Sequence, residues 1–305
     1  MPAKIVFAAF LILSIVSCKP EGNSGRQSTV TPRIVCTTGI VGDMVSGLTK
    51  GVADVQVLMG PGVDPHLFKI SQQDLGKIQE ADLVVYNGFR LEGKMSEVLA
   101  SLGSNRSIAL GELFPNSLLL YSNGSPDPHF WFDVSLWAIT ANALKDNLVS
   151  RYPQFRVQFE KNAQEVSRRL ESLHNEIKAA FDALPAERRV LVTAHDAFGY
   201  YGRAYGIEVH GLQGISTLAE FGLQDLSSMT NFLCERKIPA VFIESSVSPR
   251  SIEAVKEGCA KRGHSITLGG TLYSDALGEQ GKEAGNYEGM LRYNTRTITD
   301  ALQGQ

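Results

Sequence analysis

The stretch Asp127-Pro128-His129-Phe130-Trp131-Phe132-Asp133 carries a pattern that the chain uses twice. Earlier in the chain, Asp64-Pro65-His66-Leu67-Phe68 repeats the order Asp, Pro, His, apolar residue, Phe. Proline fixes its own φ angle and disfavours the helical conformation for the residue before it. Each triplet is therefore expected to hold a histidine at the stiff end of a loop, where a helix can begin. Two such imidazoles indicate a preformed ligand site, although two turns that happen to contain histidine are an equal alternative on this pattern alone.

Short apolar runs alternate with segments of helical periodicity on both sides of this stretch. We predict strands at residues 33–37, 55–59, 83–86, 118–121, 189–193, 207–209, 241–244 and 265–268, and helices at 41–48, 71–79, 95–102, 198–205, 226–236, 252–261 and 287–302. Strands separated by helices are typical of parallel sheets that helices cover on both faces. The pattern therefore predicts an α/β fold with two lobes, each a mostly parallel sheet flanked by helices.

The longest helical pattern lies between the two halves. Apolar residues recur at steps of three and four from Phe159 to Leu184, with charged residues between them. This pattern predicts an amphipathic helix of about 30 residues, roughly 45 Å long, that begins near Pro153 and ends at Pro185. We expect it to join the lobes rigidly; a coiled-coil arm is the alternative, which the short, isolated repeat disfavours. The predicted division is an N-terminal α/β lobe at 33–152, a linking helix at 153–185 and a C-terminal α/β lobe at 186–305.

The N-terminus reads as an export signal. Lys4 precedes an apolar run at residues 5–16 that is too short to span a bilayer as an ordinary transmembrane helix. The run ends in Ile15-Val16-Ser17-Cys18, which resembles a bacterial lipobox; the alternative is an ordinary signal peptide followed by an incidental cysteine. We predict a signal peptide at 1–17, lipidation of Cys18 and a flexible tether at 18–32. The mature chain is then an exported lipoprotein that faces the periplasm or the cell exterior.

Composition excludes several classes of function. The chain has 305 residues and a net charge of −3, so it offers no basic surface for nucleic acid. Its four cysteines include no Cys-x-x-Cys pair, which excludes a thiolate zinc site and a dithiol redox motif of that kind. Cys234 and Cys259 fall late in two helices that flank the same predicted strand. An exported compartment permits a disulfide between them, but the spacing leaves this open.

Two further polar side chains follow predicted strands of the second half. His195 comes after the apolar run 190–192, and Asp275 follows residues 272–274. In open α/β sheets, ligands bind outside the carboxyl ends of the strands. With His66 and His129, each half would then contribute two ligands to one cleft. Three imidazoles and a carboxylate suit Zn²⁺, and a carboxylate that binds through both oxygens would suit Mn²⁺ or Fe²⁺.

Other polar residues have two interpretations each. Asp133 lies near a helix start and is expected to cap that helix, although it is also a candidate to orient His129 from behind. Asp196 and Glu244 have the same two interpretations, and Asp64 reads as a turn residue. The remaining histidines are weaker candidates: His174 on the long helix, His210 at a strand end near the cleft, and His264 in a turn.

Six motifs together resemble a known family. They are Gly62-Val63-Asp64-Pro65-His66-Leu67-Phe68, Asp127-Pro128-His129-Phe130-Trp131-Phe132-Asp133, Thr193-Ala194-His195-Asp196-Ala197-Phe198-Gly199-Tyr200, Gln213-Gly214-Ile215-Ser216-Thr217, Phe242-Ile243-Glu244-Ser245 and Leu272-Tyr273-Ser274-Asp275-Ala276-Leu277-Gly278. In this order they resemble the zinc/manganese solute-binding lipoproteins of ABC importers, the TroA type, over nearly the whole mature chain. The resemblance implies two α/β lobes joined by one rigid helix, with a metal ion held between them.

The same resemblance implies a ligand set and partners. By motif, the ligand positions are His66, His129, His195 and Asp275, and the partners are an importer permease and its ATPase, with the chain acting as a monomer. Family members that favour manganese often have Glu where this chain has His195. Many dedicated zinc members carry a long His-rich acidic loop, and this chain has no such loop between residues 107 and 126. Zinc, manganese and iron therefore remain open.

The sequence favours one function over two others. We expect the chain to capture a divalent metal ion between its lobes and deliver it to a permease, without being an enzyme. The alternative is a zinc-dependent hydrolase, which would need an open coordination position for water and a nearby general base. A full set of four ligands and the absence of a His-Glu-x-x-His motif argue against it. For a third reading, a surface adhesin, the sequence offers no repeat.

Overall fold

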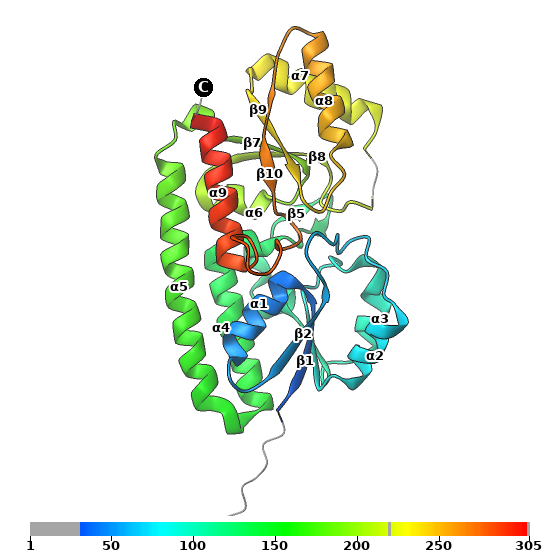
Figure 1. Ribbon diagram of the computed structural model, residues 1–305, viewed down its shortest axis with the longest axis vertical. Helices are drawn as coiled ribbons and strands as arrows, with labels where there is room; N and C mark the ends of the chain where they lie inside the picture. Colours follow the sequence, from blue (N-terminus) through cyan, green and yellow to red (C-terminus); the bar gives the residue numbers. More distant parts are fainter. Residues whose placement is uncertain (1–30, 219–220, 304–305) are drawn as a thin grey trace, which may run out of the picture. The chain divides into compact units, whose positions relative to one another are not determined.

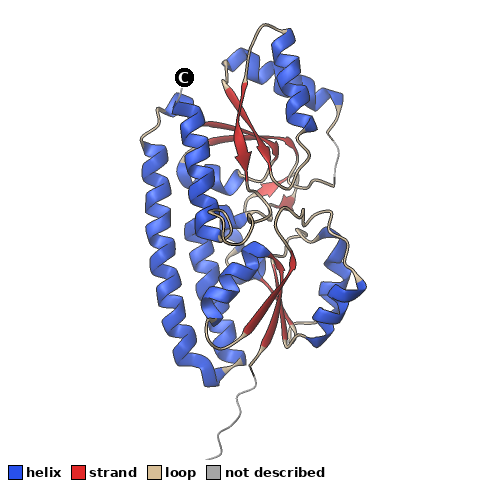
Figure 2. Cartoon of the chain, in the orientation of Figure 1, coloured by secondary structure: helices blue, strands red, loops and turns tan. Residues whose placement is uncertain are grey.

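The computed structural model of the chain describes residues 31–218 and 221–303. The predicted signal peptide, Cys18 and most of the predicted tether lie outside these residues. Within them, the fold is the α/β arrangement that the alternation of apolar runs predicts (Figure 2). None of the helices in these ranges combines the length and the apolar composition that crossing a bilayer requires.

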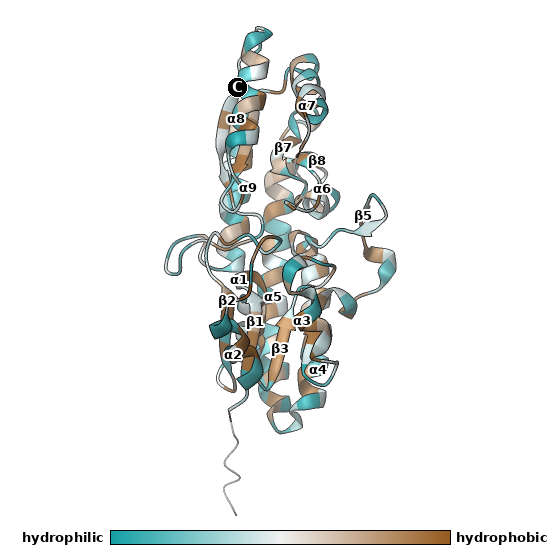
Figure 3. Cartoon of the chain, turned by 90° about the vertical axis from the view of Figure 1, so that its right-hand side faces the viewer, coloured by the Kyte–Doolittle hydropathy of each residue, from teal (hydrophilic) through white to brown (hydrophobic). Residues whose placement is uncertain are grey.

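The first sheet has four parallel strands in the order β2-β1-β3-β4. Its strands are β1 (Arg33–Thr38), β2 (Asp54–Met59), β3 (Leu83–Tyr86) and β4 (Ser107–Ala109), and its connecting helices are α1 (Gly39–Thr49), α2 (Gln72–Glu80) and α3 (Ser96–Ser101). Strands β1 and β3 are apolar on both faces because helices cover both faces of a parallel sheet. In Figure 3 strand β3 is accordingly brown, while α2 carries teal, hydrophilic positions. Ser71 and Asp74 form a capping box at the start of α2.

The second half contains two parallel strand pairs, β7–β8 and β9–β10, with β7 lying beside β9 (Figure 1). The strands are β7 (Val190–His195), β8 (Glu208–Gln213), β9 (Ala240–Glu244) and β10 (Thr267–Leu272), and the helices are α6 (Gly199–Tyr205), α7 (Leu223–Arg236) and α8 (Arg250–Lys261). Helix α6 ends at Gly206, whose φ of 69° is the left-handed conformation that glycine tolerates best. Cys234 on α7 and Cys259 on α8 are free thiols.

A layer of three helices runs beside both sheets: α4 (Val134–Arg151), α5 (Arg156–Asp182) and α9 (Tyr287–Gln303). Helix α5 contacts both of the others and lies at the outer edge of the layer (Figure 1). The predicted long helix is confirmed: α5 has 27 residues and follows a 3-10 turn that begins at Pro153. Helix α9 matches its prediction to within one residue. Helix α4 has 18 residues; the sequence predicted a helix start near Asp133 but not the extent of this helix.

Irregular segments connect these elements. Six 3-10 turns lie at Gly93–Met95, Leu110–Leu113, Asn116–Leu118, Phe130–Phe132, Pro153–Phe155 and Ala186–Arg188. The predicted strand at 118–121 is wrong in position: β5 (Tyr121–Ser122) pairs antiparallel with β6 (Ser125–Pro126) instead. Asn123 and Gly124 form the turn between them with φ angles of 52° and 79°. Both residue types tolerate positive φ, which a two-residue hairpin turn requires.

The largest apolar core passes through the layer of three helices. It begins with Ile34 of the first sheet, continues through Phe159 and Leu173 of α5, and reaches Phe242 of β9 and Leu302 of α9. A smaller, separate core lies between β7, β9, α7 and α8. The first sheet and the strand pairs of the second half therefore pack against the same apolar core on the side of the three helices. The division at residues 33–152, 153–185 and 186–305 stays a prediction.

Candidate metal centre

The two Asp-Pro-His triplets have the same local structure. Asp64 Oδ1 accepts a hydrogen bond from the backbone N–H of His66 at 2.8 Å, and Asp127 Oδ1 accepts one from the backbone N–H of His129 at 2.9 Å. A carboxylate that bonds the backbone two residues onward closes an Asx turn. The proline between them sets the φ angle of the turn. The repeated sequence pattern therefore builds one loop conformation twice.

The fold brings His66, His129, His195 and Asp275 together. One donor atom from each lies within 4.8 Å of all the others. The Nε2 atoms of His66, His129 and His195 are 3.6, 3.4 and 3.3 Å from the nearest carboxylate oxygen of Asp275. All four residues are buried, with at most 1% of their surface exposed.

Two of the three imidazoles have a carboxylate behind them. Asp127 Oδ1 lies 2.7 Å from Nδ1 of His129. Glu244 lies 2.6 Å from Nδ1 of His195 and also accepts a hydrogen bond from its backbone N–H at 2.9 Å. These contacts occupy Nδ1 and leave Nε2 directed at Asp275. A carboxylate behind a metal-binding imidazole fixes the ring and makes it a stronger base. The contact between His195 Nδ1 and Glu244 is close enough for an ion pair, although neither atom has a hydrogen bond of good geometry. Nδ1 of His66 has no hydrogen-bond partner among the described residues either, and no carboxylate lies behind it.

Burial and charge act on the first two imidazoles in opposite ways. Burial lowers the pKa of His66 to about 4, so this ring is neutral at pH 7. Burial would also lower the pKa of His129. Asp127 and Asp275 outweigh that effect and raise it to about 9. The structure therefore holds a proton on His129 when no cation is bound.

The pKa values of His195 and Asp275 are also set by the charged groups around them. Burial disfavours the charged form of His195, but Glu244 and Asp275 hold its pKa well above the ordinary value. Burial likewise opposes ionisation of Asp275, yet His195 and His129 hold its pKa well below the ordinary value. Asp275 is therefore a buried carboxylate whose negative charge depends on the cations around it.

The cluster fits a divalent cation. Both carboxylate oxygens of Asp275 and the three Nε2 atoms are buried without hydrogen-bond partners. Each such atom costs about 1–3 kcal/mol when nothing binds it. In a regular tetrahedron with bonds of about 2.1 Å, donor atoms are about 3.4 Å apart. The distances of 3.3–3.6 Å from the two oxygens of Asp275 to the three rings are close to that spacing, and all four donor atoms lie within 4.8 Å of one another.

Comparison with known proteins identifies the family. The family model described as zinc-uptake complex component A, periplasmic, matches residues 34–301. The chain belongs to this family. The manganese-binding lipoprotein MntA of Bacillus subtilis (strain 168) is 42% identical over 304 residues, which cover 99% of this chain and 98% of the relative. The zinc-binding protein TroA of Treponema pallidum (strain Nichols) is 43% identical over 283 residues, which cover 92% of each chain.

Solved structures agree with this assignment. The periplasmic zinc binding protein TroA from Treponema pallidum has a TM-score of 0.87 at 43% identity, covering 89% of this chain and 99% of that chain. The Fe(III)-bound YtgA from Chlamydia trachomatis has a TM-score of 0.81 at 25% identity, covering 89% of this chain and 98% of that chain. The predicted resemblance and the predicted fold are both confirmed.

Within this family fold, Asp133 caps a helix and does not orient His129. Its carboxylate accepts hydrogen bonds from the backbone of Ser135 and Leu136 at 3.1 Å, at the start of α4, and pairs with Arg203 at 3.1 Å. The capping prediction is confirmed, and the orienting interpretation is wrong because Asp127 occupies that position. Glu244 has the orienting contact that the sequence offered as one of two interpretations.

The three weaker histidines lie outside the cluster. His174 Nδ1 is 3.3 Å from the hydroxyl of Tyr205. His210 Nε2 is 2.8 Å from Glu208, with its ring centre 4.2 Å from that of Phe232. His264 Nε2 is 2.8 Å from the carbonyl oxygen of Ile238. Asp196, the aspartate that the sequence left with two interpretations, donates its backbone N–H to the carbonyl of Gly214 at 3.4 Å.

The sequence missed a buried carboxylate beneath the His129 loop. Glu92 is 2% exposed and accepts hydrogen bonds from the hydroxyl of Thr37 at 2.7 Å and from the backbone N–H of Asn87 at 2.8 Å. The side chain of Asn87 in turn donates to the carbonyl of Pro128 at 2.9 Å. Glu92 and Asn87 thus connect the end of β1 and the loop after β3 to the loop of His129 by buried hydrogen bonds.

Trp131 connects the His129 loop to the loop of Asp275. Its indole Nε1–H donates to the carbonyl of Ser274 at 3.2 Å, and its own carbonyl accepts from the hydroxyl of Tyr287 at 2.6 Å. Trp131 is 1% exposed. The loop of His129 and the loop of Asp275 are therefore joined by buried hydrogen bonds.

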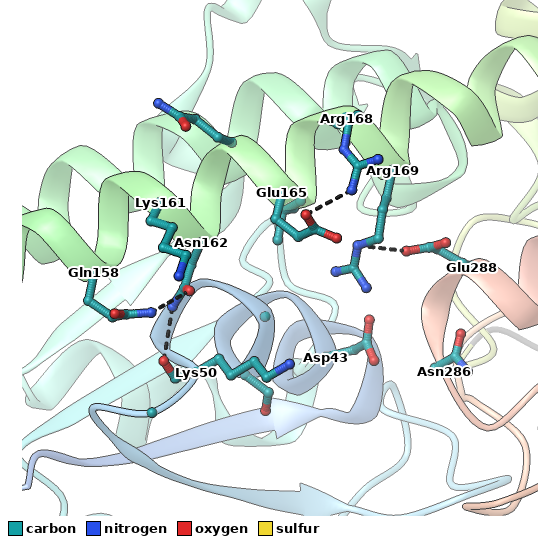
Figure 4. Close-up of a pocket in the computed structure, with 15 residues that line it drawn as sticks. Asp43, Lys50, Gln158, Lys161, Asn162, Glu165, Arg168, Arg169, Asn286 and Glu288 are labelled. Carbon is teal, nitrogen blue, oxygen red and sulfur yellow. Dashed lines mark hydrogen bonds and ion pairs between the residues drawn. The ribbon is translucent and has the colours of Figure 1, made fainter.

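A hollow of about 1090 Å³, separate from the cluster of His66, His129, His195 and Asp275, lies between α1, α5 and the start of α9 (Figure 4). Much of its charge is already paired, because Arg168 contacts Glu165 at 2.8 Å and Arg169 contacts Glu288 at 3.4 Å. None of the four clustered residues lines it. Its size therefore reflects the seam between helices rather than a second reactive site.

We expect Asp127→Asn to lower the pKa of His129 in the metal-free protein, because burial then acts without the carboxylate that opposes it. A pKa raised above the unfolded value of about 6.5 contributes stability that is complete below that pH. This contribution is lost as pH rises through about 9. NMR titration of the imidazole nitrogens measures the shift. Glu208→Gln, which changes a carboxylate beside His210, is the control, and an unchanged pKa in Asp127→Asn contradicts the assignment.

Proposed function

We propose that the chain captures a divalent metal ion, zinc or manganese, outside the cytoplasm and delivers it to the permease and ATPase of an ABC importer. One observation carries the proposal: three imidazoles and a carboxylate, buried and otherwise unpartnered, converge on a single point. In this proposal His66, His129, His195 and Asp275 bind the ion. The residues behind them, Asp127 and Glu244, orient the rings.

The family description, a component of a zinc-uptake complex, supports transport, and the relatives leave the choice of metal open. MntA is described as manganese-binding and TroA as zinc-binding, at 42% and 43% identity. Nitrogen donors favour Zn²⁺ over Mn²⁺ in the ordinary order of affinities, and carboxylate binding through both oxygens suits Mn²⁺. We propose that the site binds Zn²⁺ more tightly and that the metal carried in the cell depends on which ion is available.

The zinc-hydrolase alternative has no observation in its favour. A hydrolytic zinc ion keeps one coordination position for water and needs a general base beside it. Here four donors already surround the centre, and Glu244, the nearest further carboxylate in the second half, is engaged with His195. The family contains periplasmic solute-binding proteins, which bind and release their ligand without converting it.

We propose further that Cys18 carries the lipid anchor. The relative MntA is described as a lipoprotein and matches over 99% of this chain. Residues 18–32 then act as the tether between the membrane and the folded part that begins near β1.

We expect His195→Ala to weaken binding of Zn²⁺ by more than about 100-fold, because losing a ligand costs more than losing a partner behind a ligand. Isothermal calorimetry on protein stripped with a chelator measures the change. His210→Ala is the matched control, since His210 also lies on a strand of the second half but contacts Glu208 instead of the cluster. Wild-type affinity in His195→Ala would remove this residue from the site.

The same variant tests delivery in cells. A host that carries His195→Ala is expected to lose uptake of radiolabelled metal as fully as a host that lacks the protein. Uptake that depends on the protein but not on His195 would contradict capture at this site.

Direct competition tests the order of metals. We expect Zn²⁺ to displace Mn²⁺ from the purified protein at equal concentrations, because imidazole nitrogens favour Zn²⁺. Elemental analysis after equilibration with both ions measures the ratio. Retention of Mn²⁺ against equal Zn²⁺ would overturn the proposed order and would point to a five-coordinate site.

Membrane fractionation tests the anchor. Cys18→Ser is expected to move the protein from the membrane fraction to the soluble extracytoplasmic fraction, because acyl chains hold a lipoprotein at the membrane. Mass spectrometry of the mature N-terminus identifies the modification directly. Unchanged membrane association of Cys18→Ser, with no acyl group on the wild type, would refute lipidation.

A further inference from the structure

His66 is held differently from the other two imidazoles. The rings of His129 and His195 each rest on a carboxylate at Nδ1, with distances of 2.7 and 2.6 Å. Nδ1 of His66 is buried without such a partner among the described residues. Its position therefore depends on its loop, and that loop is fixed by Asp64 through the backbone N–H of His66 at 2.8 Å.

Asp64 also reaches across to the other half of the fold. Its second oxygen, Oδ2, accepts a hydrogen bond from the hydroxyl of Thr217 at 2.6 Å. Thr217 lies beyond strand β8, 153 residues further along the chain. One carboxylate thus binds the loop of His66 with one oxygen and the second half with the other. Its counterpart in the repeated triplet, Asp127, contacts both the backbone N–H and the ring Nδ1 of His129 through Oδ1.

Leu218 covers the same loop beside Thr217. A Cβ atom added to Gly93 would lie 3.2 Å from Cδ1 of Leu218 and 3.6 Å from the carbonyl oxygen of His66. Gly93 therefore permits the close approach of both segments. A hollow of about 400 Å³ adjoins them, and its lining includes His66, Gly93 and Leu218. Leu218 is 50% exposed, so this contact lies at the mouth of the site.

Two other contacts between the halves lie deeper. Trp131, which is 1% exposed, bonds to Ser274, and the hydroxyl of Tyr200 donates to the carbonyl of Asp127 at 3.2 Å. Tyr200 and Trp131 both belong to the large shared core. Separating these groups would expose apolar surface, whereas separating Thr217 from Asp64 breaks one hydrogen bond at a partly buried position. Parting the halves beside His66 therefore costs less than parting them at Trp131 or Tyr200.

We propose that Thr217 and Leu218 form a latch on the Asp64–His66 loop that sets how fast the bound metal ion leaves. This inference rests on the proposed function, because it concerns release from the same four residues. While the latch is closed, the Thr217 hydroxyl keeps Asp64 in place, and Asp64 keeps His66 on the ion. When it opens, His66 is the ligand that leaves first, since no carboxylate holds its ring.

Release kinetics test the latch. The protein is loaded with Zn²⁺ and mixed with an excess of a chromogenic chelator in a stopped-flow instrument. Thr217→Val keeps the shape of the side chain and removes the hydroxyl. We expect release about tenfold faster or more, the effect of losing one hydrogen bond to a charged acceptor. Thr217→Ser restores the hydroxyl and is expected to release Zn²⁺ at nearly the wild-type rate.

Two controls separate the latch from general destabilisation. Thr267→Val removes a hydroxyl that donates to the carbonyl of Pro239 at 3.2 Å, in the second half but away from the mouth, and is expected to leave the release rate unchanged. The melting temperature of the metal-free protein is expected to be the same in Thr217→Val and Thr217→Ser, because the rate difference comes from opening rather than unfolding.

The outcomes distinguish the latch from the function on which it rests. If the wild type binds Zn²⁺ and Thr217→Val releases it at the wild-type rate, the latch is refuted and the proposed function stands. Equal acceleration in Thr217→Val and Thr217→Ser also refutes it, because the hydroxyl is then irrelevant. If the wild type binds neither Zn²⁺ nor Mn²⁺, the proposed function falls and the latch falls with it.

Discussion

The carboxylate of Asp275 is the charge on which the centre of this structure depends. It is buried, and three imidazoles approach it within 3.3–3.6 Å. An ion removed from water in this way is stable only when opposite charges and hydrogen bonds replace its hydration. Asp127 and Glu244 lie on the outer sides of His129 and His195 and stabilise these rings. Carboxylates and imidazoles therefore alternate outward from Asp275. Loops from both halves must therefore meet at one point for the fold to close.

This alternation also explains how the centre can exist with and without an ion. With protons on His129 and His195, the three carboxylates and two imidazolium rings carry one net negative charge. Three carboxylates, three neutral imidazoles and one divalent cation carry the same net charge. In the proposed function, a divalent ion that displaced protons from both rings would therefore leave the net charge of these groups unchanged.

Local sequence patterns predicted the elements with a clear apolar contrast and failed where that contrast is weak or where glycine intervenes. Helix α5 has one apolar stripe with charged residues between its members and was predicted. The buried residues of α4 also recur at steps of three and four, but they form a broad face that includes the polar Thr140, and the exposed face carries the apolar Ile139, so the two faces differ little. Strands β8 and β10 extend beyond their predictions because Gly211 and Gly270 resemble chain breaks. A Cβ at Gly211 would lie 2.4 Å from the backbone of Asp196, and Gly270 lies at a bulge with a φ of 143°.

In the site, contacts between residues close in sequence could be predicted, whereas most contacts between residues far apart in sequence could not. The Asp-Pro-His triplets are local, and the fold brings their histidines together with His195 and Asp275 as expected. The orienting role of Asp127 was also readable, because an aspartate two residues before a histidine can reach both its backbone and its ring. Glu92 and Thr217 act through partners 55 and 153 residues away, and no pattern near either residue indicates those contacts.

The shared interior of the two sheets has a consequence for recognition by a membrane partner. Because one apolar core passes from Ile34 through α5 to Leu302, the two halves cannot swing apart as independent bodies. If the chain carries a metal ion as proposed, its loaded and empty forms would then have nearly the same outline. A receptor that accepts only the loaded form would have to recognise a few side chains at the rim of the site, since the angle between the halves would differ little between the two forms.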